Sequence, residues 1–190
     1  MTTTLLRPTI RFVVTAAALF AAWSVHAQQV DLVVPQAGRS GAMAPVDETF
    51  ALTAISAGLA QVEGARLVLT KAKRSDVREF AEATLRTHGQ ALDELRRIAA
   101  GRGSKVPATA TGRHADMVTK LSGLAMPDVE DAFVQRFGVD AHKELIALHE
   151  RHAKEGPDPA LRKYAAAVLA SLRENLAAAQ KLVHVAAGAR

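Results

Sequence analysis

Cysteine is absent from this 190-residue sequence, and its absence removes several kinds of site at once. Disulfide bonds, thiolate metal ligands, a cysteine nucleophile and a lipid-modified cysteine anchor are all excluded. Aromatic residues are also scarce, at 4% of the chain, although 49% of the residues are hydrophobic. Alanine and leucine supply most of the apolar content, and both form helices at little entropic cost. The composition therefore predicts an all-α protein, and the length favours one domain.

A strong excess of one charge is missing as well. The formal net charge is +5, and two of the 24 basic residues, Arg7 and Arg11, lie in an N-terminal segment that has no acid. Without these two, 22 basic residues stand against 19 acidic ones. No basic run interleaved with aromatic residues is found, so no nucleic-acid partner is predicted.

The N-terminal segment has the parts of a secretory signal peptide. Arg7 and Arg11 form a positive region, residues 12–23 are apolar, and Val25 and Ala27 suit a cleavage point before Gln28. Twelve helical residues span about 18 Å, which is short of the ~30 Å hydrocarbon core. We therefore expect residues 1–27 to be removed during export to a bacterial periplasm, leaving no stable membrane span. The alternative is an uncleaved inner-membrane anchor.

Residues 28–46 contain two prolines and two glycines without a helical period, and they predict a flexible tether. From residue 47 to 188 the pattern is helical. Four long helices are expected over the ranges 47–73, 75–100, 126–156 and 157–188, with Asp158 as the N-cap of the last. A loop over 101–112 and a short helix over 113–124 lie between the second and third. Short turns favour antiparallel neighbours, so an up-down-up-down four-helix bundle is predicted.

Each of the four expected long helices carries one polar residue in or beside its apolar stripe. These residues are Glu63, His88, His142 and Asn175, with His142 about 100° from Ala141 and so on the flank of its stripe. Counted at about 1.5 Å per residue from two turns at a shared end, all four fall near one level. Buried carboxylates and imidazoles need partners. Two explanations stay open, a hydrogen-bonded network or a divalent transition metal ion such as Zn, Cu, Fe or Mn.

Two further histidines, His149 and His152, are three residues apart. With His142 they suggest an outer metal site, but the charged residues around them favour a solvated helix end. Phosphate-binding loops, a nucleophile elbow and a Ser/His/Asp arrangement are all missing, so no catalytic residue is assigned.

The run from Asp47 to Leu95 resembles the exported bacterial DUF4142 family, through Phe50, Glu63, Phe80 and His88. Similarity continues through His142 and Asp158, and covers about residues 46–183. The resemblance implies a ferritin-like four-helix bundle whose biochemical role is unassigned. This chain has Thr87-His88 where the family has Asp-His, and Asn175 where the family usually has a histidine. The Glu-x-x-His pairs of di-iron bundles are missing, which argues against ferroxidase chemistry.

Two hypotheses for function follow. In the first, the protein is an exported, non-catalytic helical bundle with a mid-bundle metal site at Glu63, His88, His142 and Asn175. In the second, it is an envelope structural, interaction or stress-related protein whose polar core is purely structural and binds no metal. A protein partner and the oligomeric state are left open by both.

Overall fold

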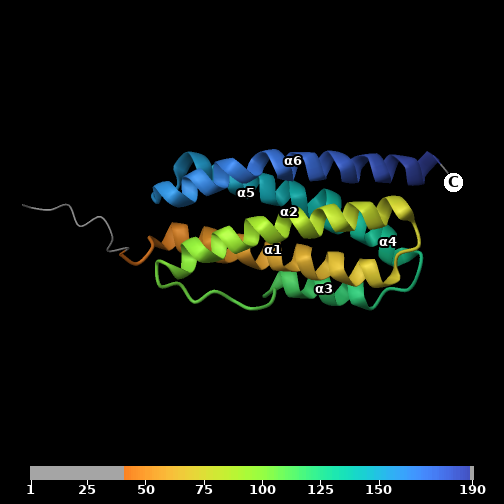
Figure 1. The fold of residues 1–190 in the computed structure, drawn as a ribbon, viewed down its shortest axis with the longest axis horizontal. Coiled ribbons are helices and arrows are strands. Elements are labelled where there is room, and N and C mark those ends of the chain that lie inside the picture. Colours follow the sequence, from red (N-terminus) through yellow and green to blue (C-terminus); the bar gives the residue numbers. More distant parts are fainter. Residues whose placement is uncertain (1–40, 189–190) are drawn as a thin grey trace, which may run out of the picture. The chain divides into compact units, whose positions relative to one another are not determined.

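The computed structural model describes residues 41–188, and every regular element in that range is a helix. α1 (Pro45–Lys71) and α2 (Ser75–Ala100) form an antiparallel hairpin, drawn in orange to green in Figure 1. No helix in this range is both long enough and apolar enough to cross a membrane. The predicted signal peptide, residues 1–27, and most of the predicted tether, residues 28–46, lie outside the described residues.

The second half of the chain begins with α3 (Arg113–Ser122), which confirms the expected short helix between the second and third long ones. The third long helix runs without a break but consists of three segments. These are α4 (Asp128–Ala132), a π-helical segment η1 (Phe133–Asp140) and α5 (Ala141–Glu155). α6 (Pro159–Gly188) completes the bundle.

The two tight turns of the bundle lie at opposite ends. The α1–α2 turn meets the start of α4, where the backbone NH of Arg74 donates to Glu130 Oε1 at 2.9 Å. The α5–α6 turn meets the start of α1, where the NH of Asp158 donates to Asp47 Oδ2 at 3.2 Å. The helices α1, α2, α5 and α6 therefore run up, down, down and up (Figure 1).

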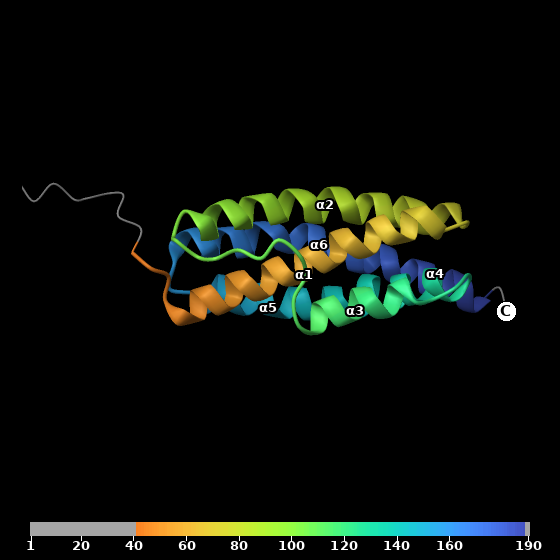
Figure 2. The same cartoon turned by 90° about the horizontal axis from the view of Figure 1, so that it is seen from below.

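The predicted four-helix bundle is confirmed, but its predicted up-down-up-down order is wrong. The order differs because the connection over residues 101–127 runs back along the bundle before the third long helix begins. This connection places α3 beside α1 (Figure 2). An extended chain of this length reaches about 90 Å, whereas α2 is only about 39 Å long. A connection this long permits either direction for the next helix.

Asp158 ties the last helix to the rest of the bundle. Its Oδ1 accepts hydrogen bonds from the NH groups of Ala160 at 2.8 Å and Leu161 at 3.0 Å, which confirms the predicted N-cap. Arg102, just beyond the end of α2, donates from Nη2 to the same oxygen at 3.0 Å. One carboxylate thus caps α6 and joins it to α2.

Small residues allow the helices to approach closely around η1. A Cβ built on Gly138 would lie 2.6 Å from Ala179 Cβ and 3.1 Å from Phe80 Cε1. A Cβ on Gly64 would overlap the ring of Phe137. Both distances are shorter than van der Waals contact, so glycine is required where η1 packs between α1 and α6.

We expect Gly138→Ala to lower the free energy of unfolding by about 1–3 kcal/mol, because the added methyl group overpacks the contact with α6. Gly89→Ala is the matched control, since nothing lies within 4 Å of its Cβ. This control should raise stability by about 0.5–1 kcal/mol through the better helix propensity of alanine. Urea unfolding of both variants measures the difference. Equal effects of the two changes would contradict the close packing.

Candidate functional site

The π-helical segment η1 determines which side of the third long helix faces the core. Its wider turns leave the Phe137 carbonyl available to side chains, and this oxygen accepts from Gln61 Nε2 at 3.0 Å and His142 Nδ1 at 2.8 Å. The wider turns also delay the rotation of the helix, so His142 rather than Ala141 enters the core. His142 is fully buried, which corrects its predicted position on the flank.

A pair of buried imidazoles lies at the middle of the bundle. His88 Nε2 and His142 Nε2 are 3.0 Å apart. Because His142 Nδ1 donates to the Phe137 carbonyl, the Nε2 of a neutral His142 carries a lone pair, and His88 Nε2–H is the donor. Burial lowers the pKa of both side chains, and for His88 the neighbouring His142 and His149 act in the same direction. Both rings are therefore neutral at pH 7.

Asn175 lies beside this pair but bonds to a different partner. Its Nδ2 donates to Thr87 Oγ1 at 2.9 Å, while the Thr87 hydroxyl donates to the Ala83 carbonyl at 3.0 Å. Since the single hydroxyl proton is used by Ala83, Thr87 must accept from the amide NH₂. Asn175, Thr87, His88, Tyr164 and His149 are among the residues that line a small cavity of about 20 Å³.

Glu63 does not join the other three predicted site residues. Its Oε1 accepts from the backbone NH of Ala110 at 3.2 Å and so holds the connection before α3. The buried polar residue of α1 near this level is instead Gln61, two positions earlier and 1% exposed. Within residues 41–188 no group of three or more His, Asp or Glu side chains is arranged to hold a metal ion. The predicted set of Glu63, His88, His142 and Asn175 is therefore only partly brought together.

His149 and His152 are buried, which makes the predicted solvated helix end wrong. His149 Nδ1 donates to the Leu145 carbonyl at 2.7 Å. The ring of His152 stacks on Phe50 with centroids 3.8 Å apart, and its Nε2 lies 3.1 Å from Asp47 Oδ1. The spacing from His142 through Leu145 to His149 and His152 was the signal for a core face, because steps of three and four keep to one side of a helix.

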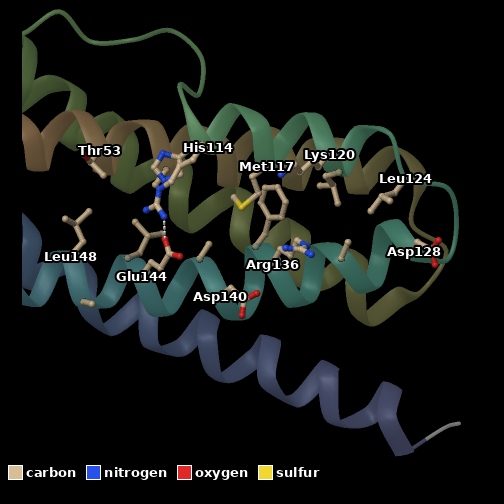
Figure 3. A pocket seen from close by; sticks show the side chains of 18 of the residues that line it. Thr53, His114, Met117, Lys120, Leu124, Asp128, Arg136, Asp140, Glu144 and Leu148 are labelled. Carbon is tan, nitrogen blue, oxygen red and sulfur yellow. Dashed lines mark ion pairs between the residues drawn. The ribbon is translucent and has the colours of Figure 1, made fainter.

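A much larger groove lies outside this core, between α3 and the η1–α5 helix, and Thr53 and Ala57 of α1 also line it. Its volume is about 970 Å³. Figure 3 shows Met117 and Lys120 on the α3 wall, and Arg136, Asp140 and Glu144 on the opposite wall. The apolar lining includes Ala57, Met117, Leu121, Leu124, Phe137, Leu145 and Leu148.

Hydrogen bonds at its two ends hold α3 in place along the groove. At the start, Ser56 Oγ accepts from the NH of Thr111 at 2.9 Å and lies 3.0 Å from His114 Nδ1. Past the end, Lys71 Nζ donates to the carbonyls of Ser122 at 3.0 Å and Leu124 at 3.3 Å. The helix is thus anchored to α1, and the groove remains between α3 and α5.

The rim of the groove carries seven charged residues, of which four are basic. These are Arg113, Lys120, Arg136 and Arg151, against Asp128, Asp140 and Glu144. Glu144 pairs with Arg113 at 2.8 Å, which is the dashed contact in Figure 3. Asp140 Oδ1 accepts from Gln135 Nε2 at 3.0 Å. Lys120 and Arg136 have no ion-pair partner within residues 41–188 and stand on opposite walls.

Comparison with known proteins supports the fold and the family. A family model described as a domain of unknown function, DUF4142, matches residues 32–182. The crystal structure of a DUF305 fragment from Deinococcus radiodurans is similar in fold, with a TM-score of 0.64 and 15% sequence identity. The similarity covers 75% of this chain and 98% of that fragment. No curated protein matches the sequence.

The buried histidines should make the protein acid-labile. Burial lowers the pKa of His149 from 6.5 to about 4. An unfolded chain therefore takes up the proton first as the pH falls, and stability is lost between about pH 6.5 and 4. For His149 alone the loss approaches about 3 kcal/mol.

Urea unfolding between pH 7.5 and 4 should show a smaller loss in His149→Gln than in the natural protein. His184→Gln is the matched control, because His184 is an exposed histidine of α6. A loss of the same size in all three proteins would exclude His149 as a source of the acid sensitivity.

Proposed function

The chain belongs to the DUF4142 family of domains of unknown function, and we propose that it is an exported, non-catalytic binding protein. The proposed ligand is an amphiphile with a single acyl or alkyl chain and an anionic head group. The proposed binding site is the groove between α3 and the η1–α5 helix. The observation that carries the proposal is the groove itself, which has a volume of about 970 Å³, several apolar lining residues and basic residues on both walls.

The size and lining of the groove suit an apolar chain. Sites for small molecules in proteins are mostly apolar concavities of about 300–1,000 Å³ with a few placed polar groups. The lining of this groove extends along its longer wall from Asp128 to Arg151, which is about 35 Å of helix. A long groove with apolar residues along its length matches an extended hydrocarbon chain better than a compact ring system.

Charge favours an anionic head group. Lys120 and Arg136 face each other across the channel, and neither has an ion pair within the described residues (Figure 3). Arg136 can hold a carboxylate or phosphate with two hydrogen bonds, and Lys120 adds a second positive charge. Arg113 is already paired with Glu144, so its charge contributes less to binding an anionic head group. A head group between Lys120 and Arg136 would leave the chain along apolar lining residues such as Leu148.

The residues of the groove support binding rather than catalysis. His114 is its single histidine, and the Nδ1 of that ring contacts Ser56 Oγ at 3.0 Å. Burial lowers the pKa of His114, and the adjacent Arg113 adds to this effect. A catalytic base would need a reacting group and an orienting partner in the same channel, and the lining supplies no such set.

Export to the periplasm is the second part of the proposal and rests on the N-terminal sequence. Arg7, Arg11 and the apolar residues 12–23 have the order of a secretory signal, and Gln28 would be the first residue of the mature protein. A soluble carrier of amphiphiles is useful in an aqueous compartment between two membranes, where such molecules have low solubility.

Ligand binding can be tested with a fluorescent fatty-acid analogue displaced by unlabelled compounds. We expect a C16 carboxylate or sulfate to displace the probe at about tenfold lower concentration than the C16 alcohol, because only the anions pair with Lys120 and Arg136. Met117→Trp should weaken binding, because the larger indole ring narrows the groove at its α3 wall. Arg136→Glu should remove the preference for the anion over the alcohol.

Matched controls are Ala166→Trp on the exposed face of α6 and Arg86→Glu on α2, neither of which lines the groove. Both should bind like the natural protein. If no amphiphile displaces the probe, or if Met117→Trp binds normally, the groove is not a ligand site. A protein with a purely structural core would then be the better hypothesis.

Cleavage of the signal can be tested on protein recovered from the periplasm. Its intact mass should correspond to a chain that begins at Gln28, because Val25 and Ala27 suit the signal peptidase. Recovery of the chain in the membrane fraction with residues 1–27 attached would show an uncleaved anchor instead.

A further inference from the structure

Three of the side chains that line the small cavity beside His88 each have an unpaired hydrogen-bond acceptor. His149 donates from Nδ1 to the Leu145 carbonyl, so its Nε2 carries a lone pair with no donor in residues 41–188. Asn175 donates through Nδ2 to Thr87, so its Oδ1 is likewise left without a donor in that range. His88 donates from Nε2 to His142, which leaves Nδ1 with a lone pair. Acceptors that face such a cavity are satisfied either by a hydrogen-bond donor, such as a water molecule, or by a cation.

The histidines around this cavity are prepared as ligands. A histidine that binds a metal ion usually donates its other ring NH to a carbonyl or carboxylate, which fixes the ring and its tautomer. His149 does this with the Leu145 carbonyl at 2.7 Å, so its Nε2 is held as a lone pair without any metal bound. His142 does the same with the Phe137 carbonyl at 2.8 Å, but its Nε2 accepts from His88 and so is not directed to the cavity.

The charge of the surroundings limits which ion can enter. None of the residues that line the cavity is an Asp, Glu, Lys or Arg. Glu63, which could have compensated a divalent ion, is turned away toward Ala110. The cost of burying an ion grows with the square of its charge, so a monovalent ion enters neutral ligands far more cheaply than a divalent one. The volume of about 20 Å³ is enough for one small ion or one water.

We propose that this cavity binds one soft monovalent metal ion of the copper(I) class, with His88 and His149 as nitrogen ligands and Asn175 as a weaker oxygen ligand. Imidazole nitrogen selects such an ion over sodium or potassium, which take oxygen ligands. His142 acts as a positioning residue, because it receives the proton of His88 and so fixes that ring. Compared with the four residues predicted from the sequence, this site has His149 in place of Glu63. It is separate from the groove and does not depend on the proposed ligand there.

The test is anaerobic competition between the purified protein and a chromogenic copper(I) chelator, repeated with silver(I) and zinc(II). One equivalent of copper(I) should be withheld from the chelator. Affinity should fall about a hundredfold in His149→Phe and in His88→Leu. Asn175→His should bind about tenfold more tightly, because imidazole is the better ligand for this ion. Silver(I) should behave like copper(I).

His184→Gln is the matched control and should bind like the natural protein, since His184 is exposed on α6. Three results would overturn the proposal. The first is no copper(I) withheld by either the natural protein or Asn175→His, which would leave a buried water as the occupant. The second is binding that His184→Gln abolishes and His149→Phe does not. The third is zinc(II) bound as tightly as copper(I) at the same residues.

Core substitutions can prevent folding, so circular dichroism of each variant comes first. If His149→Phe or His88→Leu does not fold, the natural protein still decides. Silver(I) should then shift the imidazole ¹⁵N resonances of His88 and His149 and leave those of His184 unchanged. Shifts at His184 alone would contradict the proposal.

Discussion

The carbonyl of Phe137 accepts hydrogen bonds from Gln61 on α1 and from His142 on the next turn of its own helix. In a regular α-helix this oxygen would be occupied by the backbone NH four residues on. The π-helical segment frees it, and the two side chains then join α1 to the third long helix. The same bond sets the tautomer of His142, which determines that His88 donates to it. The polarity of the His88–His142 pair therefore follows from one displaced backbone bond.

The groove has an independent origin in the order of the helices. Since the two tight turns lie at opposite ends, the chain must travel back along the bundle between α2 and α4. α3 is the folded part of that return, and its anchors to α1 are Ser56 at one end and Lys71 at the other. An up-down-up-down bundle would need no such segment. The wall of the proposed amphiphile site is therefore a consequence of the topology.

Several features were predictable because they depend on local patterns. The helical content, the short helix over 113–122 and the N-cap Asp158 follow from composition, spacing and turn residues. The placing of His88, His142 and Asn175 near one level also survived the wrong topology. Each lies near the middle of a helix of similar length, so its height is about the same when counted from either end. Glu63 and Gln61 show the limit of this prediction, because both lie near that level. Only the rotation of α1 about its axis decides that Gln61 is buried in the core and Glu63 is not.

The sequence by itself determined an all-α bundle with polar residues at mid-height, since helical periodicity is a local property of the chain. The tertiary structure decided the rest. A π-helical segment shifted the core face between Phe137 and His142, and a stripe extended through it at 3.6 residues per turn misses that shift. The 27-residue connection between α2 and α4 is long enough for α5 to run in either direction, so the length of this connection does not predict the direction. Which polar side chains share a cavity, and where a groove opens, depend on contacts between helices that are far apart in sequence.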